Sequence, residues 1–290
     1  MSSAVWAEEE DLPPGQAFTA NVEVGAILVP VTVKDSKGRL IANLEKDRFR
    51  LFVDGIETPI RSFWREGGLP LSLAVVLDTS GSMGGRRLTR AREAITEFLR
   101  QRGPKDEVCL ITFGAQEVKR RLKFGTDPGL LPRVLESLRG FGTTSLYDVL
   151  TVAPQFMDGA GNVRRAVLLF TDGVDTASQF TPENAIGVLQ GLNDPLYAFG
   201  IEPPPVEGEG DSYGTLLDRF STASGGRYLR VGNLSALPEM ARVLRRELTL
   251  RYIIALTPSG VGSEKWRTIE VKVDGNYTVL TRHGYRGTLP

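Results

Sequence analysis

The sequence predicts an α/β protein in which a doubly wound, mostly parallel six-stranded sheet is inserted into a β-sandwich built from both chain ends. Two observations support this prediction. From Leu69 onward, short apolar runs alternate with helical patterns, as is typical of a parallel sheet covered on both faces. Before and after that region, only strand patterns occur. With 290 residues, of which 41% are hydrophobic, the chain can bury one large core or two modest ones, and we expect two.

The first residues, 1–17, contain acids, prolines and glycine without hydrophobic periodicity, so a disordered leader is expected there. Val5-Trp6-Ala7 followed by an acidic run resembles the end of a signal peptide, although the charged and apolar regions that precede a cleavage site are missing. A truncated signal peptide, an internal start at Met1 and a frayed tail all stay open. The first of these favours a secreted, periplasmic or cell-surface protein.

Residues 18–66 are expected to form about half of the β-sandwich. Valine and isoleucine recur from Val22 to Val33 and lead into a turn at 35–38, while Phe49 to Val53 leads into Asp54-Gly55, which is a hairpin signal. A single helical turn is expected at most, around Leu44 to Asp47.

The other half of the sandwich is expected from residues 250–290, where strands are predicted at 251–257, 266–273 and 277–282. Three strands rarely form a stable domain alone. The economical solution is that they pair with residues 18–66, because chain ends that lie close together permit such an insertion.

Residues 69–249 are predicted to form the inserted domain. Its strands are expected at 71–77, 107–114, 116–124, 164–171, 195–201 and 226–231, and its helices at 86–102, 128–139, 145–158, 182–193, 212–223 and 235–249. The link between 114 and 116 is too short for a crossover helix, so the third strand should be an antiparallel edge strand. The basic stripe from Lys119 to Lys123 lies on this strand, where charges protect an exposed edge from aggregation.

The composition argues against several classes of protein. Lys plus Arg equals Asp plus Glu at 35 each, so no global field attracts nucleic acid or an anionic membrane. No run approaches the roughly 18 apolar residues of a membrane-spanning helix, so no transmembrane segment is expected in this chain. The single cysteine, Cys109, cannot form an internal disulfide and is expected to be a buried small hydrophobe.

Two apolar runs end in an acidic residue that opens a loop. Leu71 to Leu77 leads into Asp78-Thr79-Ser80-Gly81-Ser82, and the run before Thr171 leads into Asp172-Gly173. A third loop, 140–146, carries hydroxyl groups just before a predicted helix. In an open α/β sheet the loops beyond the carboxyl ends of the strands meet where the winding reverses, so we expect these three loops to share one crevice. Carboxylates and serine hydroxyls at this spacing suit a hard divalent cation.

These motifs resemble those of the von Willebrand factor A domains, which carry a metal-ion-dependent adhesion site. Asp78-Thr79-Ser80-Gly81-Ser82 resembles the family's first motif, Thr144 its isolated threonine and Asp172 its second aspartate. The resemblance covers about residues 70–250 and implies a Rossmann-type fold. It implies that Ser80, Ser82 and Thr144 touch Mg²⁺ or Mn²⁺, with Ca²⁺ less favoured, while Asp78 and Asp172 hold the ion largely through bound water.

The flanking residues extend the resemblance. Val29 to Phe63 and Tyr252 to Tyr285 are similar to bacterial von Willebrand factor A-related proteins described from Acidobacteria, which pair the inserted domain with a β-rich flank and are generally exported.

Four residues or segments near the motifs have more than one interpretation. Thr143 is the alternative ligand to Thr144 if the loop shifts by one residue, although the family's Gly-x-Thr spacing favours Thr144. Ser145 is expected to cap the following helix, and Asp175 to be solvated rather than a ligand. The acidic loop 207–211 is a weaker candidate for a second cation.

The resemblance implies a noncatalytic adhesion or scaffolding module, in which the metal completes its coordination with an Asp or Glu carboxylate of a partner protein. One alternative is a metal-dependent phosphotransferase or hydrolase, and another is a metal that only rigidifies the loops. The enzyme is disfavoured because Ser80 stands where a second Asp would act as general acid. The lone His283 lies far along the chain in a predicted strand, which argues against a Ser-His-Asp triad. The sequence indicates neither the partner nor the oligomeric state.

Overall fold

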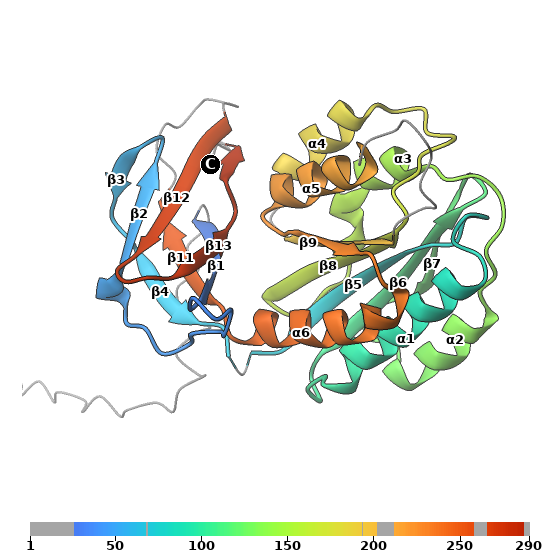
Figure 1. The fold of residues 1–290 in the computed structure, drawn as a ribbon, viewed down its shortest axis with the longest axis horizontal. Helices are drawn as coiled ribbons and strands as arrows, with labels where there is room; N and C mark the ends of the chain where they lie inside the picture. The colour runs from blue at the N-terminus through green and yellow to red at the C-terminus, as the bar shows by residue number, and fades with distance from the viewer. Residues whose placement is uncertain (1–25, 68, 193, 202–211, 258–265, 287–290) are drawn as a thin grey trace, which may run out of the picture.

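The computed structural model describes residues 26–67, 69–192, 194–201, 212–257 and 266–286. The expected leader 1–17, the beginning of the first predicted strand and the acidic loop 207–211 lie outside the described residues. Figure 1 shows two units side by side, an α/β unit and a smaller β unit, which are joined by two chain segments. None of the helices in the described ranges combines the length and the apolar character that a membrane crossing requires.

The α/β unit is built on a six-stranded sheet with the order β10-β9-β8-β5-β6-β7. Its strands are β5 (Leu71–Asp78), β6 (Glu107–Gly114), β7 (Glu117–Leu122), β8 (Arg164–Thr171), β9 (Leu196–Ile201) and β10 (Tyr228–Val231). All neighbours are parallel except β6 and β7, which are antiparallel. The doubly wound, mostly parallel sheet and the antiparallel edge strand that carries the basic stripe are therefore confirmed.

The winding of this sheet reverses between β5 and β8. From β5 the chain first adds β6 and β7 on one side, and then returns to add β8, β9 and β10 on the other. Every residue of β5 is buried, as expected for a central strand covered on both faces. The gap between the carboxyl ends of β5 and β8 is the place where an open α/β sheet binds ligands.

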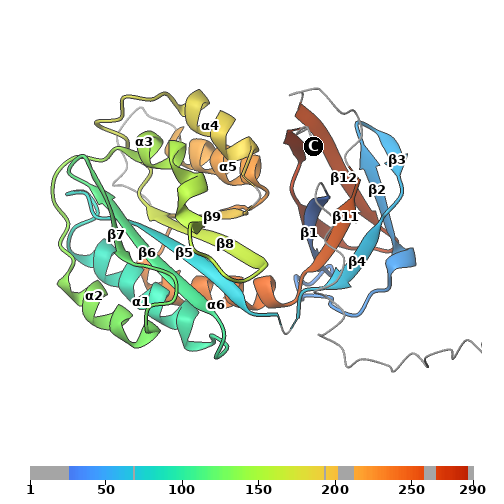
Figure 2. The same cartoon turned by 180° about the vertical axis from the view of Figure 1, so that it is seen from behind.

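Helices cover both faces of this sheet (Figure 2). One face is covered by α1 (Arg86–Arg100), α2 (Leu131–Ser137) and α6 (Leu237–Thr249), and the other by α3 (Leu146–Thr151), α4 (Pro182–Gln190) and α5 (Ser212–Ser224). Alternate side chains of β5 enter different cores, because Leu73 and Val75 pack with the first set while Ala74 and Val76 pack with the second.

Several predicted helices are interrupted. The pattern at 145–158 forms α3 and the 3-10 helix η3 (Ala153–Met157), because Pro154 lacks the N–H that would continue an α-helix. The patterns at 128–139 and 235–249 likewise begin as the 3-10 helices η2 (Pro128–Leu130) and η4 (Leu234–Ala236).

The β unit contains two four-stranded sheets, with the orders β13-β1-β11-β4 and β14-β12-β2-β3. Their strands are β1 (Ile27–Lys34), β2 (Phe49–Val53), β3 (Ile56–Thr58), β4 (Ser62–Arg65), β11 (Tyr252–Leu256), β12 (Trp266–Val273), β13 (Thr278–Thr281) and β14 (Gly284–Arg286). Antiparallel pairing of β1 with β11 and of β2 with β12 joins segments from the two chain ends.

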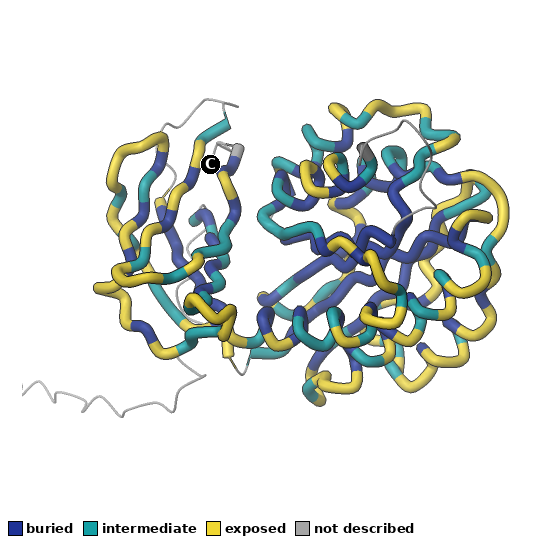
Figure 3. The backbone as a smooth tube through the Cα atoms, viewed as in Figure 1, coloured by how far each residue is buried: buried dark blue, intermediate teal, exposed yellow. Residues whose placement is uncertain are grey.

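One hydrophobic core fills the β unit (Figure 3). It takes Val29 and Tyr252 from one sheet and Leu51 and Val271 from the other. The expected helical turn near residue 46 is the 3-10 helix η1 (Lys46–Arg48). The strand predicted at 277–282 is β13, and β14 follows it as an additional short strand. His283 is exposed between the two, so the prediction that it lies in a strand is wrong.

A buried cluster of charges fixes both segments that join the units. Glu66 follows β4 and Arg251 follows α6, and both side chains are buried. The Arg251 guanidinium donates to both carboxylate oxygens of Glu66, and also to the Tyr197 hydroxyl at 3.1 Å. Arg164 adds a second cation, with its Nε 3.6 Å from Glu66 Oε2. The crossing segments are therefore held by ion pairs and hydrogen bonds rather than by apolar packing alone.

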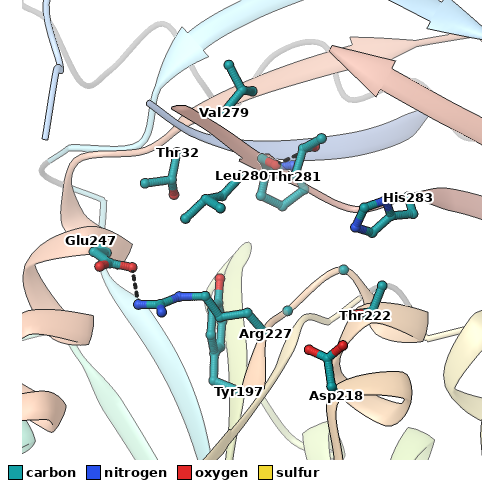
Figure 4. Close-up of a pocket in the computed structure, with 13 residues that line it drawn as sticks. Thr32, Tyr197, Asp218, Thr222, Arg227, Glu247, Val279, Leu280, Thr281 and His283 are labelled. Atoms are coloured by element: carbon teal, nitrogen blue, oxygen red, sulfur yellow. Dashed lines mark hydrogen bonds and ion pairs between the residues drawn. The ribbon is translucent and has the colours of Figure 1, made fainter. Parts of the chain in front are cut away.

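A cavity of about 310 Å³ lies between the units (Figure 4). Asp218, Thr222 and Arg227 of the α/β unit face Leu280 and His283 of the β unit across it. At its edge, Glu247 accepts hydrogen bonds from Arg227 at 2.7 Å and from Lys34 of β1 at 2.6 Å, which links the units. This cavity lies at the amino ends of β9 and β10, opposite the loops that carry the predicted metal ligands.

Candidate metal centre

The two predicted acidic ligands lie at adjacent strand ends. Asp78 is the last residue of β5, and Asp172 directly follows β8. These strands are parallel neighbours, with Leu77 opposite Phe170. Both aspartates therefore stand at the edge where the winding of the sheet reverses.

The Asp78 carboxylate is buried and held by neutral donors. Its Oδ1 accepts a hydrogen bond from the Ser80 backbone N–H at 2.8 Å, and its Oδ2 accepts one from the Thr171 hydroxyl at 2.7 Å. Burial raises the pKa of Asp78 to about 6, and the charge of Asp172 acts in the same direction, although the hydrogen bonds from Ser80 and Thr171 oppose the shift. Neither of these two donors is a cation. The hydrogen bonds of Asp78 therefore leave its negative charge uncompensated.

The two serines of the first loop bring their hydroxyls together. Ser80 Oγ and Ser82 Oγ are 3.2 Å apart, with Ser80 buried and Ser82 exposed. The alternate spacing places both side chains on the same side of the loop, which is why a pattern of one Asp and two Ser can present several oxygens to one point.

The threonine loop, 140–144, packs directly on the serine loop. The Gly81 N–H donates to the Gly142 carbonyl at 2.9 Å, and the Phe141 N–H donates to the Thr79 carbonyl at 3.0 Å. Glycine is required at residue 140, because a Cβ there would lie 2.9 Å from the Ser80 carbonyl oxygen. The sequence-predicted meeting of these two loops is therefore present.

The two candidate threonines differ in their surroundings. Thr144 is buried, whereas Thr143 is exposed and its carbonyl accepts a hydrogen bond from the Ala115 N–H at 2.8 Å. The Thr144 carbonyl in turn accepts hydrogen bonds from the Thr176 and Ala177 N–H groups, both at 2.9 Å. The loop after β8 is thereby tied to the threonine loop.

Asp172 has one oxygen without a donor. Its Oδ1 accepts a hydrogen bond from the Val174 N–H at 3.2 Å, but its buried Oδ2 has no hydrogen-bond partner within the described residues. The guanidinium of Arg87 lies near it, with Nη1 3.9 Å from Oδ2. A buried carboxylate oxygen without a hydrogen-bond donor lowers the stability of the folded chain unless a cation or water binds it.

These observations test whether a metal ion would fit. In the part of the chain that the structure describes, no group of three or more His, Cys, Asp or Glu side chains could hold an ion. Any ion here must therefore use hydroxyls together with the two acids, and such an oxygen donor set fits a small, hard divalent cation. The orphaned Oδ2 of Asp172 supplies the matching negative charge.

Two predictions about neighbouring residues are wrong. Ser145 occupies the position before α3, but its side chain makes no capping hydrogen bond. Asp175 is not simply solvated: its Oδ2 accepts hydrogen bonds from the Ser178 hydroxyl at 2.5 Å and from the Tyr147 N–H at 3.2 Å. The loop after β8 folds back over the start of α3, so Asp175 and Ser178 reach the free N–H groups of that helix instead.

Thr171 is a residue of the candidate site that the sequence analysis did not identify. It immediately precedes Asp172, and only the pairing of β5 with β8 places its hydroxyl against Asp78. A hydroxyl residue that follows the apolar run 166–170 and directly precedes the acid is the signal that could have identified it.

Two exposed apolar side chains lie on loops near the candidate site. Phe141 is 61% exposed and Phe180 is 52% exposed, and both lie on loops at this end of the sheet. A hollow of about 280 Å³ lies alongside, between the β6–β7 turn and the start of α3, where Gly114, Val118 and Ser145 contribute to its lining.

Comparison with known proteins identifies the family of the α/β unit. Residues 73–174 match the family model of the von Willebrand factor type A domain, a segment that includes Asp78, Ser80, Ser82, Thr144 and Asp172. The human inter-alpha-trypsin inhibitor heavy chain H4 is 27% identical over 133 residues, which is 40% of this chain but 14% of the human protein. The minor fimbrium subunit Mfa5 of Porphyromonas gingivalis is 26% identical over 141 residues, or 44% of this chain and 11% of the subunit.

Similarity of structure extends beyond the α/β unit. The von Willebrand factor type A protein of Catenulispora acidiphila matches 93% of this chain and 75% of its own, with a TM-score of 0.52 at 15% sequence identity. At that identity the match indicates a shared fold. The curated relatives named above are much longer than the segments that they share with this chain.

Proposed function

Because the α/β unit is a von Willebrand factor type A domain, we propose that this chain is a noncatalytic protein-binding module for adhesion or scaffolding that depends on a divalent metal. Asp78, Ser80, Ser82, Thr144 and Asp172 hold Mg²⁺ or Mn²⁺, with Ca²⁺ less favoured. An Asp or Glu side chain of a partner protein completes the coordination.

The observation that carries this proposal is the buried Oδ2 of Asp172, which has no hydrogen-bond partner among the described residues. Next to it, Asp78 contributes a second buried carboxylate, and the 3.2 Å pair of serine hydroxyls contributes neutral oxygens. Thr144 is preferred to Thr143 because Thr144 is buried, whereas Thr143 is exposed.

The choice of ligands explains the choice of partner. When bound, the metal would have neutral hydroxyls as its direct protein ligands and would meet the two carboxylates largely through bound water, so its positive charge could still attract a carboxylate from outside. The acids retain the ion, while Ser80, Ser82 and Thr144 add oxygens without adding negative charge. A third acid in place of one hydroxyl would quench this attraction.

The exposed side chains near the site add a second element of recognition. Phe141 stands on a loop fixed by backbone hydrogen bonds to Thr79 and Gly81, yet its ring is largely exposed. An exposed aromatic side chain on a loop with a hydrogen-bonded backbone suits burial against a partner. We place the partner's acidic residue over the metal and its apolar neighbours against Phe141 and Phe180.

The relatives and the composition bear on location and organisation. Since one relative is a fimbrium subunit, the chain is proposed to be secreted, periplasmic or on the cell surface. Residues 69–249 are proposed as the inserted domain, and 18–66 with 250–290 as the β-sandwich that carries it. The partner is a protein rather than nucleic acid, because the chain has equal numbers of basic and acidic residues.

Affinity capture tests the partner proposal. The immobilised chain and its Asp78→Ala variant are incubated with extract of the source cells in Mg²⁺ and in EDTA, and bound proteins are compared by mass spectrometry. Proteins retained by the wild type in Mg²⁺ alone are expected. Equal retention by the wild type in EDTA and by the variant would refute the proposal.

Two further measurements separate the alternatives. Calorimetric titration with Mg²⁺ or Mn²⁺ followed by an acidic peptide from a captured partner distinguishes adhesion from a purely structural metal, because only adhesion predicts that the peptide joins the loaded site. Hydrolysis of para-nitrophenyl phosphate that is lost in Asp78→Asn would instead favour the enzyme.

A further inference from the structure

Helix α1 begins with charges that do not suit a helix N-terminus. Its first two residues are Arg86 and Arg87, and its first turn contains no acidic residue. The N-terminus of a helix carries partial positive charge, so cations there are unfavourable and acids are preferred. At least one of these arginines therefore needs an explanation outside the helix.

The contacts of Arg87 supply that explanation. Its Nη1 donates to the Ser82 carbonyl at 2.8 Å and lies 3.9 Å from Asp172 Oδ2. The Arg87 side chain is 19% exposed, whereas that of Asp172 is fully buried. Arg86, by contrast, is exposed and has no ion pair with an acid among the residues that the structure describes.

The distance to Asp172 is informative. At 3.9 Å the guanidinium attracts the carboxylate by charge, but it does not hydrogen-bond to Oδ2, which stays without a donor. Arg87 is thus close enough to offset part of the charge of Asp172 without occupying its free oxygen. The repulsion between the two buried acids makes such an offset valuable while no metal is bound.

We propose that Arg87 is the built-in counter-cation of the metal centre, an inference that rests on the proposed metal site. Without metal, Arg87 stabilises the loops by partly neutralising Asp172. With metal, the same positive charge opposes the incoming cation, so Arg87 lowers the affinity of the site for the ion. It is a positioning residue for Asp172 and Ser82 rather than a ligand.

The test compares Arg87→Met with two matched variants. Arg86→Met removes a cation from the same helical turn and reports the effect of the helix terminus alone, while Arg87→Lys keeps a positive charge. Each variant of the full chain is melted in EDTA, and its affinity for Mg²⁺ or Mn²⁺ alone is measured by calorimetry.

Arg87→Met is expected to bind the metal on the order of tenfold more tightly than the wild type, since a nearby repulsive charge has been removed. In EDTA it is expected to melt about 2–4 °C below Arg86→Met, because Asp172 has lost its counter-charge. Arg87→Lys should stay close to the wild type in both measurements.

The outcomes distinguish this inference from the proposed function. If the wild type binds metal but Arg87→Met binds it equally or more weakly, the counter-cation is refuted and the metal site stands. Unchanged melting of Arg87→Met in EDTA relative to Arg86→Met would refute it as well. If no variant binds metal, the proposed metal centre fails together with the inference.

Discussion

The hydroxyl of Thr171 donates a 2.7 Å hydrogen bond to Oδ2 of Asp78, and this bond joins the carboxyl ends of two neighbouring strands. The same hydroxyl oxygen accepts a hydrogen bond from the Gly173 N–H at 3.0 Å. Thr171 thus connects the first acid of the proposed metal centre to the loop that follows the second. The strand ends at the reversal of the sheet are held together by this side chain as well as by the backbone.

Thr171→Val should destabilise the chain and weaken metal binding. Valine has nearly the same shape, but it leaves the buried Asp78 carboxylate with one donor fewer and the Gly173 N–H without its acceptor. The expected loss is about 1–3 kcal/mol in the free energy of unfolding, measured by urea titration in EDTA. Thr171→Ser, which keeps the hydroxyl, serves as the control, and a Val variant as stable as the Ser variant would contradict the argument.

Asp172→Asn is expected to have opposite effects on stability and on binding. Removing one of two repelling buried charges should raise the melting temperature in EDTA by about 2–4 °C. The proposed metal site predicts that the wild type gains stability when Mg²⁺ is added, and this gain should disappear in the variant because a metal-holding carboxylate is gone. Differential scanning calorimetry in EDTA and in Mg²⁺ measures both effects. Asp158→Asn, an exposed acid outside the site, controls for the loss of charge, and a variant that still responds to Mg²⁺ would exclude Asp172 as a ligand.

Much of the site could be predicted because its parts are local in sequence. The central parts of β5 and β8 are apolar, so their burial and parallel pairing could be predicted, and the acids at their carboxyl ends fall at one edge of the sheet. The glycines at 140 and 142 similarly marked a loop whose backbone approaches its neighbours closely.

What could not be predicted depends on pairs of residues far apart in sequence. Thr171 meets Asp78, and Asp175 meets Tyr147, only after the strands and loops have taken their positions. Ser145 had the residue type and place of a helix cap, but the N–H groups at the start of α3 donate instead to side chains of Asp175 and Ser178. The preference of serine for the N-cap position was therefore outweighed by a tertiary contact.

Cys109 should be unreactive in the folded chain. It is fully buried in β6, and burial raises the pKa of its thiol to about 11, although the charge of Arg120 opposes the shift. At pH 8 a thiol reagent such as dithiobisnitrobenzoate should label the chain only in denaturant. Since the unfolded thiol loses its proton near pH 9 and the folded thiol near pH 11, this group favours unfolding as the pH rises between these values. Urea titrations across that range should show a smaller loss of stability in Cys109→Ala, and an equal loss would contradict the role of the thiol.

Glu66→Gln should be among the most destabilising single changes outside the core, although it adds or removes no apolar contact. Glu66 is the acid that compensates the buried cations Arg251 and Arg164 where the chain passes between the units. Breaking a buried pair leaves uncompensated charge in a poorly hydrated place, so a loss of about 3–5 kcal/mol in the free energy of unfolding is expected. Glu45→Gln is the matched control, because Glu45 is 76% exposed and its 2.6 Å pair with Arg65 lies in solvent, where removal should cost no more than about 1 kcal/mol. Urea unfolding of both variants measures the difference. Equal, small losses would mean that water reaches the junction and that hydrophobic packing, rather than this ion cluster, holds the β unit against the α/β unit.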